Sequence, residues 1–211
     1  MDHTSQMAAL LSELRRERNG AAADAMSFYG KGYGLNLGVA IHTIRSIIAD
    51  YPHDHSFAEF LYRQDVRELR IAALWLAEPE RVELSSFEFW QRGITNSEIA
   101  EQAAMALLSK VDCIDTLIAE WSASQDVLIV YAALLAASRN AHCNPTGVLQ
   151  AVEMNAEHHP DNRLIARSSV AAAVSLQLRA KDEVLELAER LRLKETPTAR
   201  YIADELAWQI L

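Results

Sequence analysis

A repeated helix pattern constrains the fold of this chain more than any other feature. Five segments each open with a side chain that can cap a helix, place small residues six to eight positions later, and continue with larger apolar residues. A capping oxygen satisfies N–H groups that a first helical turn leaves free, so each segment is expected to begin a helix. The candidate caps lie 31, 30, 35 and 35 residues apart, at Asp65, Asn96, Asp126, Asp161 and Thr196.

The five segments agree in character and differ in detail. They read DVRELRIAALWLA, NSEIAEQAAMALL, DVLIVYAALLAAS, DNRLIARSSVAAAVSL and TPTARYIADELAWQI. A period of this length, with one helical hairpin per copy, is typical of α-solenoids of the HEAT, armadillo or TPR kind. The alternative is an irregular all-α bundle. We predict an all-α superhelix of about six HEAT-like hairpins, with residues 1–211 forming one domain.

Apolar residues recur at helical spacing along nearly the whole chain, and alternating β-branched runs are scarce. The connections between these periodic stretches are short, and several contain a proline or a capping residue. The pattern predicts helices at residues 4–28, 39–50, 56–63, 65–77, 85–92, 96–110, 112–121, 125–139, 145–156, 161–178, 181–193 and 197–210.

Composition limits the classes of protein that remain. The chain has 20 Lys and Arg against 29 Asp and Glu, which gives a net charge of −9. A generic nucleic-acid binder usually carries a basic total, so non-specific DNA affinity is expected only if basic residues gather on one face. With two cysteines, no secretion-like N-terminus and no long apolar run, we expect a cytoplasmic protein without disulfides.

Two kinds of motif could indicate a ligand-binding site. The stretch YGKGYGLNLG is rich in glycine, but no strand precedes it and its spacing is not that of a dinucleotide-binding loop, so we interpret it as a flexible turn. The stretches PHDH and EHHP contain histidines beside a proline in predicted loops, without the spacing of a zinc site. The sequence therefore predicts no metal and no cofactor.

Arginines recur early in the repeated helices and form the main candidate binding set. A guanidinium matches the oxygens of a phosphate, so arginines lining one face of a solenoid would follow a DNA backbone. Internal salt bridging to nearby carboxylates explains the same pattern equally well. The candidate DNA-binding residues are Arg45, Arg67, Arg70, Arg163 and Arg167.

Glu98 and Glu101 are the candidate catalytic residues. Their spacing places them on one face of the predicted helix, and paired carboxylates do acid–base work when their surroundings separate their pKa values. A solvated helix face is the alternative. The four tryptophans lie in separate repeats and are expected in the core, although indoles can also stack on bases.

The segment 37–79 resembles the AlkD-like bacterial DNA alkylation repair family, the alkylpurine DNA glycosylases built from HEAT-like repeats. The resemblance consists of Leu37-Gly38-Val39, then Arg45, then His53-Asp54-His55, then the stretch ELRIAA, and beyond these it continues as repeat architecture to about residue 179. It implies a curved α-solenoid that holds duplex DNA on its concave face and releases cationic N3- or N7-alkylated purines.

The same resemblance implies an active site that this chain departs from. The family carries a Trp-Asp-x-x-Asp-like segment at the start of the helix that corresponds to TNSEIAEQAAMALL, with a tryptophan in a later repeat. Here the tryptophan position falls at Glu98 or Ile99, the aspartate position falls near Ala103, and SSVAAAVSL has no tryptophan. No residue of the catalytic motif carries over, so activity as a DNA N-glycosylase is left open.

Two functional hypotheses follow. The first is a diverged DNA alkylation repair protein that binds duplex or alkylated DNA through its arginines, with Glu98 or Glu101 stabilising charge in any remaining chemistry. The second is a non-enzymatic HEAT-like scaffold that binds a protein or peptide partner, which the missing motif and the acidic total favour.

Overall fold

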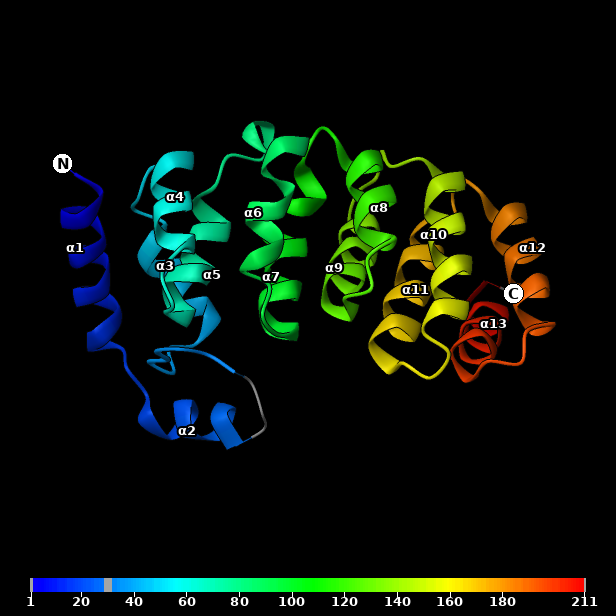
Figure 1. Ribbon diagram of the computed structural model, residues 1–211, viewed down its shortest axis with the longest axis horizontal. Coiled ribbons are helices and arrows are strands. Elements are labelled where there is room, and N and C mark those ends of the chain that lie inside the picture. Colours follow the sequence, from blue (N-terminus) through cyan, green and yellow to red (C-terminus); the bar gives the residue numbers. More distant parts are fainter. Residues whose placement is uncertain (1, 29–31, 211) are drawn as a thin grey trace.

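The computed structural model of the protein describes residues 2–28 and 32–210. Over these residues the chain forms 13 α-helices and three short 3-10 helices, and its only extended pairing is a bridge between Leu35 and Val66. The helices stand side by side in a gently curved row that follows the order of the sequence (Figure 1). The prediction of an all-α solenoid is therefore confirmed.

The row contains two layers, because each hairpin contributes one helix to each. Neighbouring helices of the second layer contact one another along the whole row. The first layer contains α1 (His3–Arg16), α4 (His55–Tyr62), α6 (Phe87–Arg92), α8 (Ile114–Ser122), α10 (Pro145–His158) and α12 (Lys181–Arg192). The second layer contains α3 (Ile41–Ile48), α5 (Arg67–Leu76), α7 (Ser97–Ala106), α9 (Val127–Ala137), α11 (Arg163–Ser175) and α13 (Pro197–Ile210).

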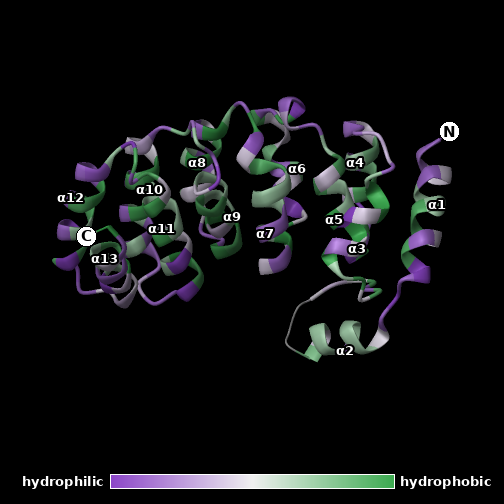
Figure 2. Ribbon diagram, turned by 180° about the vertical axis from the view of Figure 1, so that it is seen from behind, coloured by the Kyte–Doolittle hydropathy of each residue, from purple (hydrophilic) through white to green (hydrophobic). Residues whose placement is uncertain are grey.

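The small residues of the repeats lie where the helices of the second layer meet. In α9 nine residues are buried, and Ala132, Ala133, Ala136 and Ala137 are fully so. Because α9 packs against α7, α8 and α11, it is hydrophobic on all sides, as Figure 2 shows. The alanines therefore allow close approach between neighbours, as the sequence pattern suggested.

Three of the five predicted caps are confirmed. Asn96 and Asp126 accept hydrogen bonds at the starts of α7 and α9, and the hydroxyl of Thr196 accepts one from Ala199 N–H at 3.1 Å. The prediction was wrong for Asp65 and Asp161. Asp65 pairs with Arg70 at 3.1 Å, and Asn162 caps α11 in place of Asp161.

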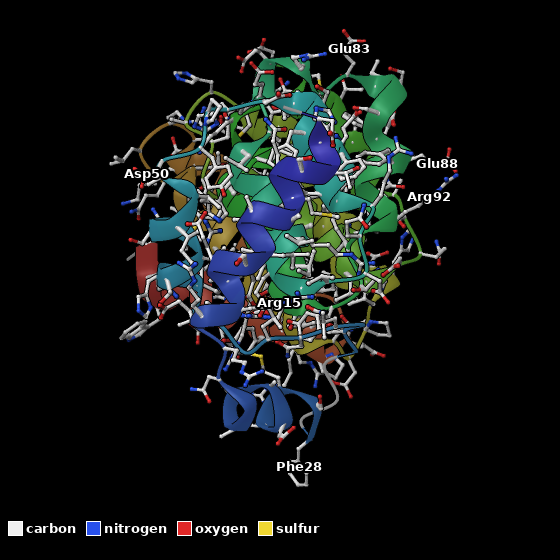
Figure 3. All side chains as sticks on the ribbon, turned by 90° about the vertical axis from the view of Figure 1, so that its left-hand side faces the viewer. Arg15, Phe28, Asp50, Glu83, Glu88 and Arg92 are labelled. Atoms are coloured by element: carbon white, nitrogen blue, oxygen red, sulfur yellow. The ribbon has the colours of Figure 1, made fainter. Side chains whose placement is uncertain are left out.

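The prediction of one helix over residues 4–28 was also wrong. The chain forms α1, which ends at Arg16, and then α2 (Gly20–Phe28), which lies outside both layers at the N-terminal end of the row (Figures 1 and 3). Asn19 causes the break, since its side chain accepts a hydrogen bond from Ala22 N–H at 3.1 Å and its own N–H donates to Leu37 O at 2.8 Å. The other eleven predicted helices are present, and the one over 96–110 ends at Ala106 before the 3-10 turn η3 (Leu108–Lys110).

Two further 3-10 turns, η1 (Pro79–Arg81) and η2 (Leu84–Ser86), connect α5 to α6. Within the described residues, no helix combines the length and the apolar character that crossing a membrane requires.

A pair of alanine substitutions tests the correction at the start of α11. Asn162→Ala should lower the free energy of unfolding by about 1 kcal/mol, because the Asn162 side chain accepts from both Leu164 N–H and Ile165 N–H. Asp161→Ala at the neighbouring exposed position should change it by less than about 0.5 kcal/mol. Urea unfolding followed by circular dichroism measures both values, and equal losses would contradict the assignment of the cap.

Candidate functional site

The candidate site is the second-layer face, by which we mean the solvent-facing side of α3, α5, α7, α9, α11 and α13. Side chains on this face connect neighbouring helices. Trp75 of α5 donates from Nε1 to Gln102 Oε1 of α7 at 3.1 Å, and Tyr131 of α9 donates to Glu101 Oε1 of α7 at 2.9 Å. These contacts join successive helices of the second layer, with Gln102 and Tyr131 themselves buried.

A hollow of about 170 Å³ lies on this face between the first turns of α11 and α13. Two hydrogen bonds of Thr198 join the helix starts: its Oγ1 accepts from Asn162 N–H at 3.0 Å and donates to His159 O at 2.6 Å. The small side chain of Ala166 leaves space between the helices. Residues from both helices line the hollow: Asp161, Asn162, Arg163, Ala166, Arg167, Pro197, Thr198 and Tyr201.

Arg163 and Arg167 give this hollow its positive charge. They lie one helical turn apart on α11, both are exposed, and neither forms an ion pair with a carboxylate in the described parts of the chain. Asp161 offsets one of the two charges. Because the positive ends of the α11 and α13 dipoles also lie at this hollow, it favours an anion.

Arg67 lies in the interior and is not on the second-layer face. Its guanidinium makes a two-pronged contact with Glu98, through Nε to Oε2 at 2.8 Å and Nη2 to Oε1 at 2.7 Å, and its Nη1 contacts Glu68 at 3.0 Å and Val39 O at 2.7 Å. Its side chain is 1% exposed. The expectation that Arg67 contacts DNA is therefore corrected, because its donors are used inside the protein.

The charges around Arg67 keep it ionised despite its burial. Burial alone lowers the pKa of Arg67, but the hydrogen bonds and negative charges of Glu98 and Glu68 outweigh it and raise that pKa above its ordinary value. Tyr33 also donates a hydrogen bond to Glu98, and burial together with this carboxylate raises the pKa of the Tyr33 hydroxyl. The group is thus a buried ionic network with satisfied partners.

The other two N-terminal arginines differ from each other. Arg70 pairs with Asp65 at 3.1 Å and donates to Gln64 O at 3.1 Å, so it follows the internal-pairing alternative. Arg45 of α3 is exposed and lies over the ring of Trp75, with its guanidinium carbon 4.1 Å from the ring centroid. Of the five predicted arginines, Arg45, Arg163 and Arg167 therefore remain accessible to a ligand.

Glu98 and Glu101 do not form a pair. Glu98 is buried against Arg67 and Tyr33 on the α5 side of α7, whereas Glu101 is exposed and bonded to Tyr131 on the α9 side. Burial and the charge of Glu101 raise the pKa of Tyr131 to about 12. The expectation of one shared face was wrong because a spacing of three residues rotates side chains enough to meet different neighbouring helices.

The glycine-rich segment was predicted to be a flexible turn, and its residues 29–31 lie outside the described part of the chain. Its following residues are held in place: Leu35 N–H donates to Asp65 O at 2.8 Å, and Glu68 accepts from Leu37 N–H and Val39 N–H at 3.1 and 3.2 Å. Gly38 adopts a φ of 72°, and a side chain there would collide with the Asn19 carbonyl. This part is a packed connection into α3.

The remaining candidates show no arrangement for chemistry. Among residues 2–28 and 32–210, no three His, Cys, Asp or Glu side chains converge as metal ligands. Trp90 and Trp121 are buried as expected, whereas Trp75 is partly exposed and Trp208 is 81% exposed.

Sequence reasoning did not select Lys110, Tyr131 or Tyr201, which also lie at this face. Lys110 of η3 places its Nζ 5.6 Å from the Trp75 centroid, and Tyr201 lines the hollow beside Arg167. In the sequence, only the position of these three residues could have pointed to them, since each lies in or just after one of the five repeated helices. Lys110 and Tyr201 are exposed, whereas Tyr131 is buried against the neighbouring helices, and packing between repeats decides which of them reach solvent.

The fold and this face together define an α-solenoid whose exposed Arg45, Arg163 and Arg167 form no ion pair within the described residues. The sequence model described as DNA alkylation repair enzyme matches residues 10–165, which is more than half of the chain, so the protein belongs to this family. The resemblance to AlkD-like proteins is confirmed.

A solved structure is similar over 100% of this chain and 96% of its own, with a TM-score of 0.72 and 17% identity. It is described as a new family of proteins related to the HEAT-like repeat DNA glycosylases, with affinity for branched DNA structures. At this identity the likeness shows the fold alone. No curated protein matches the sequence significantly.

Replacing Arg67 tests whether it is structural. Arg67→Met should lower the free energy of unfolding by about 3–5 kcal/mol, because Glu98 and Glu68 would then be buried without their partner. The control is Arg92→Met, which removes only an exposed pair with Glu88 and should cost less than about 1 kcal/mol. Denaturant titration measures both, and a loss at Arg67 as small as the control's would contradict the buried network.

Proposed function

We propose that this member of the DNA alkylation repair family binds DNA on its second-layer face. The observation that carries the proposal is the hollow at α11 and α13, where Arg163 and Arg167 are exposed and unpaired with carboxylates in the described residues. Phosphate groups are the anions that paired guanidinium groups and helix N-termini bind best. Membership of the DNA alkylation repair family supports DNA as the polymer that carries these phosphate groups.

The net charge of −9 is compatible with this proposal. Seven of the basic side chains already pair with carboxylates, so they add little to the field around the protein: Arg67, Arg70, Arg81, Arg92, Arg190, Arg192 and Lys194. Four exposed cations that form no ion pair within the described residues, Arg45, Lys110, Arg163 and Arg167, lie on or beside the second-layer helices, and a local patch of this kind attracts a polyanion even on an acidic protein. We therefore expect binding that depends on position and shape more than on net charge.

Branched duplex DNA is the substrate class that we propose to test first. The structural neighbour is described as having affinity for branched DNA structures, and this chain shares its fold over nearly its whole length. A row of six hairpins offers contacts over several repeats, so two arms of a junction would meet different helices. Linear duplex of the same composition is the natural comparison.

We further propose that binding occurs without release of an alkylated base. Glu98 is held by Arg67, and Glu101 is the carboxylate of α7 that stays exposed. The segment 95–103 contains no aspartate and no tryptophan. A charge-stabilising carboxylate against the sugar is what glycosidic cleavage of a cationic purine requires, so Glu101 is the residue to test if any base is released.

The double variant Arg163→Gln/Arg167→Gln tests the binding face. Its affinity for a fluorescent three-way junction should fall about tenfold or more at low salt, and the slope of log affinity against log salt should become shallower by about two, since two phosphate contacts are lost. The matched control is Lys181→Gln/Arg92→Gln, which changes the charge equally on first-layer helices. Equal losses in both double variants would mean a non-specific charge effect and would contradict the proposal.

Incubation with duplex DNA containing N7-methylguanine tests the proposal that binding occurs without release of an alkylated base. We expect no free base above the spontaneous rate, measured by chromatography, at protein concentrations that saturate the DNA. If base is released and Glu101→Gln reduces that release, the protein is a glycosylase that uses Glu101. If salt-sensitive DNA binding is absent altogether, the alternative of a scaffold for a protein partner takes its place.

A further inference from the structure

Three side chains from three elements converge on the second-layer face, away from the hollow at α11. The guanidinium carbon of Arg45 in α3 lies 4.1 Å from the centroid of the Trp75 ring in α5, and the Nζ of Lys110 in η3 lies 5.6 Å from the same centroid. The two cationic groups are therefore less than 10 Å apart. Contacts of this kind between a cation and an indole are favourable by about 0.5–1 kcal/mol at exposed sites.

The indole is held in a fixed orientation. Its Nε1 donates to Gln102 Oε1 at 3.1 Å, and Gln102 is 4% exposed in the body of α7. Trp75 is itself partly buried. A ring anchored at its polar end by a buried amide presents a rigid surface, so the cations that rest on it lose little further freedom when they bind a ligand.

The two cations lack a carboxylate partner. Arg45 and Lys110 are both exposed, and in the described ranges of the chain neither forms an ion pair. Two such cations therefore contact the same indole in a protein whose net charge is −9. Like charges less than 10 Å apart repel, and a bound anion near both offsets that repulsion.

We propose that Arg45, Trp75 and Lys110 form a second phosphate-binding site, which takes the sugar–phosphate backbone of DNA. The inference rests on the proposed function and adds to it a contact that the hollow at α11 does not include. Trp75 is a positioning residue here, because the cationic groups of Arg45 and Lys110 both lie over its ring and compete with a base for stacking there. Arg45 and Lys110 make the contact with phosphate.

The position of this site extends the binding surface along the row. Three helices of the second layer, α5, α7 and α9, lie between α3 and α11. Neighbouring packed helices are about 8–10 Å apart, which places the two phosphate sites about 25–40 Å from each other. That span is comparable to one turn of duplex DNA, about 34–36 Å, so a single duplex or two arms of a junction can reach both.

The test measures the salt dependence of binding for single charge-removing variants. Fluorescence anisotropy with the three-way junction and with linear duplex, between about 50 and 200 mM salt, gives an affinity and a slope for each protein. Arg45→Gln and Lys110→Gln should each make the slope shallower by about one and weaken binding several-fold at the lowest salt. Lys181→Gln, with the same change of charge at an exposed position on α12, should leave the slope unchanged.

Trp75→Phe and Trp75→Leu separate positioning from charge. Both keep the net charge, so a purely electrostatic role of the cations predicts wild-type binding. Positioning predicts that Trp75→Leu weakens junction binding, while Trp75→Phe, which retains an aromatic ring, recovers most of the affinity. Thermal unfolding of each variant shows that the proteins compared are folded at the temperature of the assay.

The possible results are distinct. If the wild type binds DNA and Arg163→Gln/Arg167→Gln weakens it, but Arg45→Gln and Lys110→Gln behave like Lys181→Gln, this inference is overturned and the proposed function stands. If Trp75→Leu binds like wild type, the positioning role is overturned. If the wild type shows no salt-sensitive DNA binding, the proposed function fails and the second phosphate site fails with it.

Discussion

The buried pairing of Arg67 with Glu98 is the interaction on which the N-terminal half of the structure depends. It joins the first turn of α5 to the first turn of α7, two helices whose sequences lie 31 residues apart. Through Val39 O and through Glu68 it also holds the segment that leads into α3. Since α3 carries Arg45, this ionic network positions part of the exposed surface without contacting solvent itself.

The sequence was sufficient to predict the architecture because the repeat signals are local. Asn96 and Asp126 cap N–H groups two or three positions away, and the alanines that follow appear in every copy. The break at Asn19 was missed because the residue that fixes it, Leu37, is distant in sequence. Arg67 and Glu98 were expected at an exposed face for the same reason: whether a charged side chain turns inward depends on partners that are distant in sequence, such as Tyr33 for Glu98.

The basic side chains of this protein differ in whether a carboxylate neutralises them. Many basic groups form ion pairs in which a carboxylate cancels their charge, as in Arg190 with Glu153 and Lys194 with Glu157. The second-layer face keeps Arg45, Lys110, Arg163 and Arg167 without such partners among the described residues. Family membership together with these exposed arginines and lysine is the basis of the proposed DNA-binding face, with phosphate contacts proposed at two places along the row.

Hydroxyl-radical footprinting of the protein, free and bound to a three-way junction, tests the central claim most directly. It reports by mass spectrometry which side chains DNA covers. If DNA lies on the second-layer face, oxidation of Trp75 and Tyr201 should fall on binding, while Leu84 and Leu193, which are 53% and 84% exposed outside the second-layer helices, should be oxidised as before. Protection of Leu84 or Leu193 with no change at Trp75 and Tyr201 would contradict the assignment of this face.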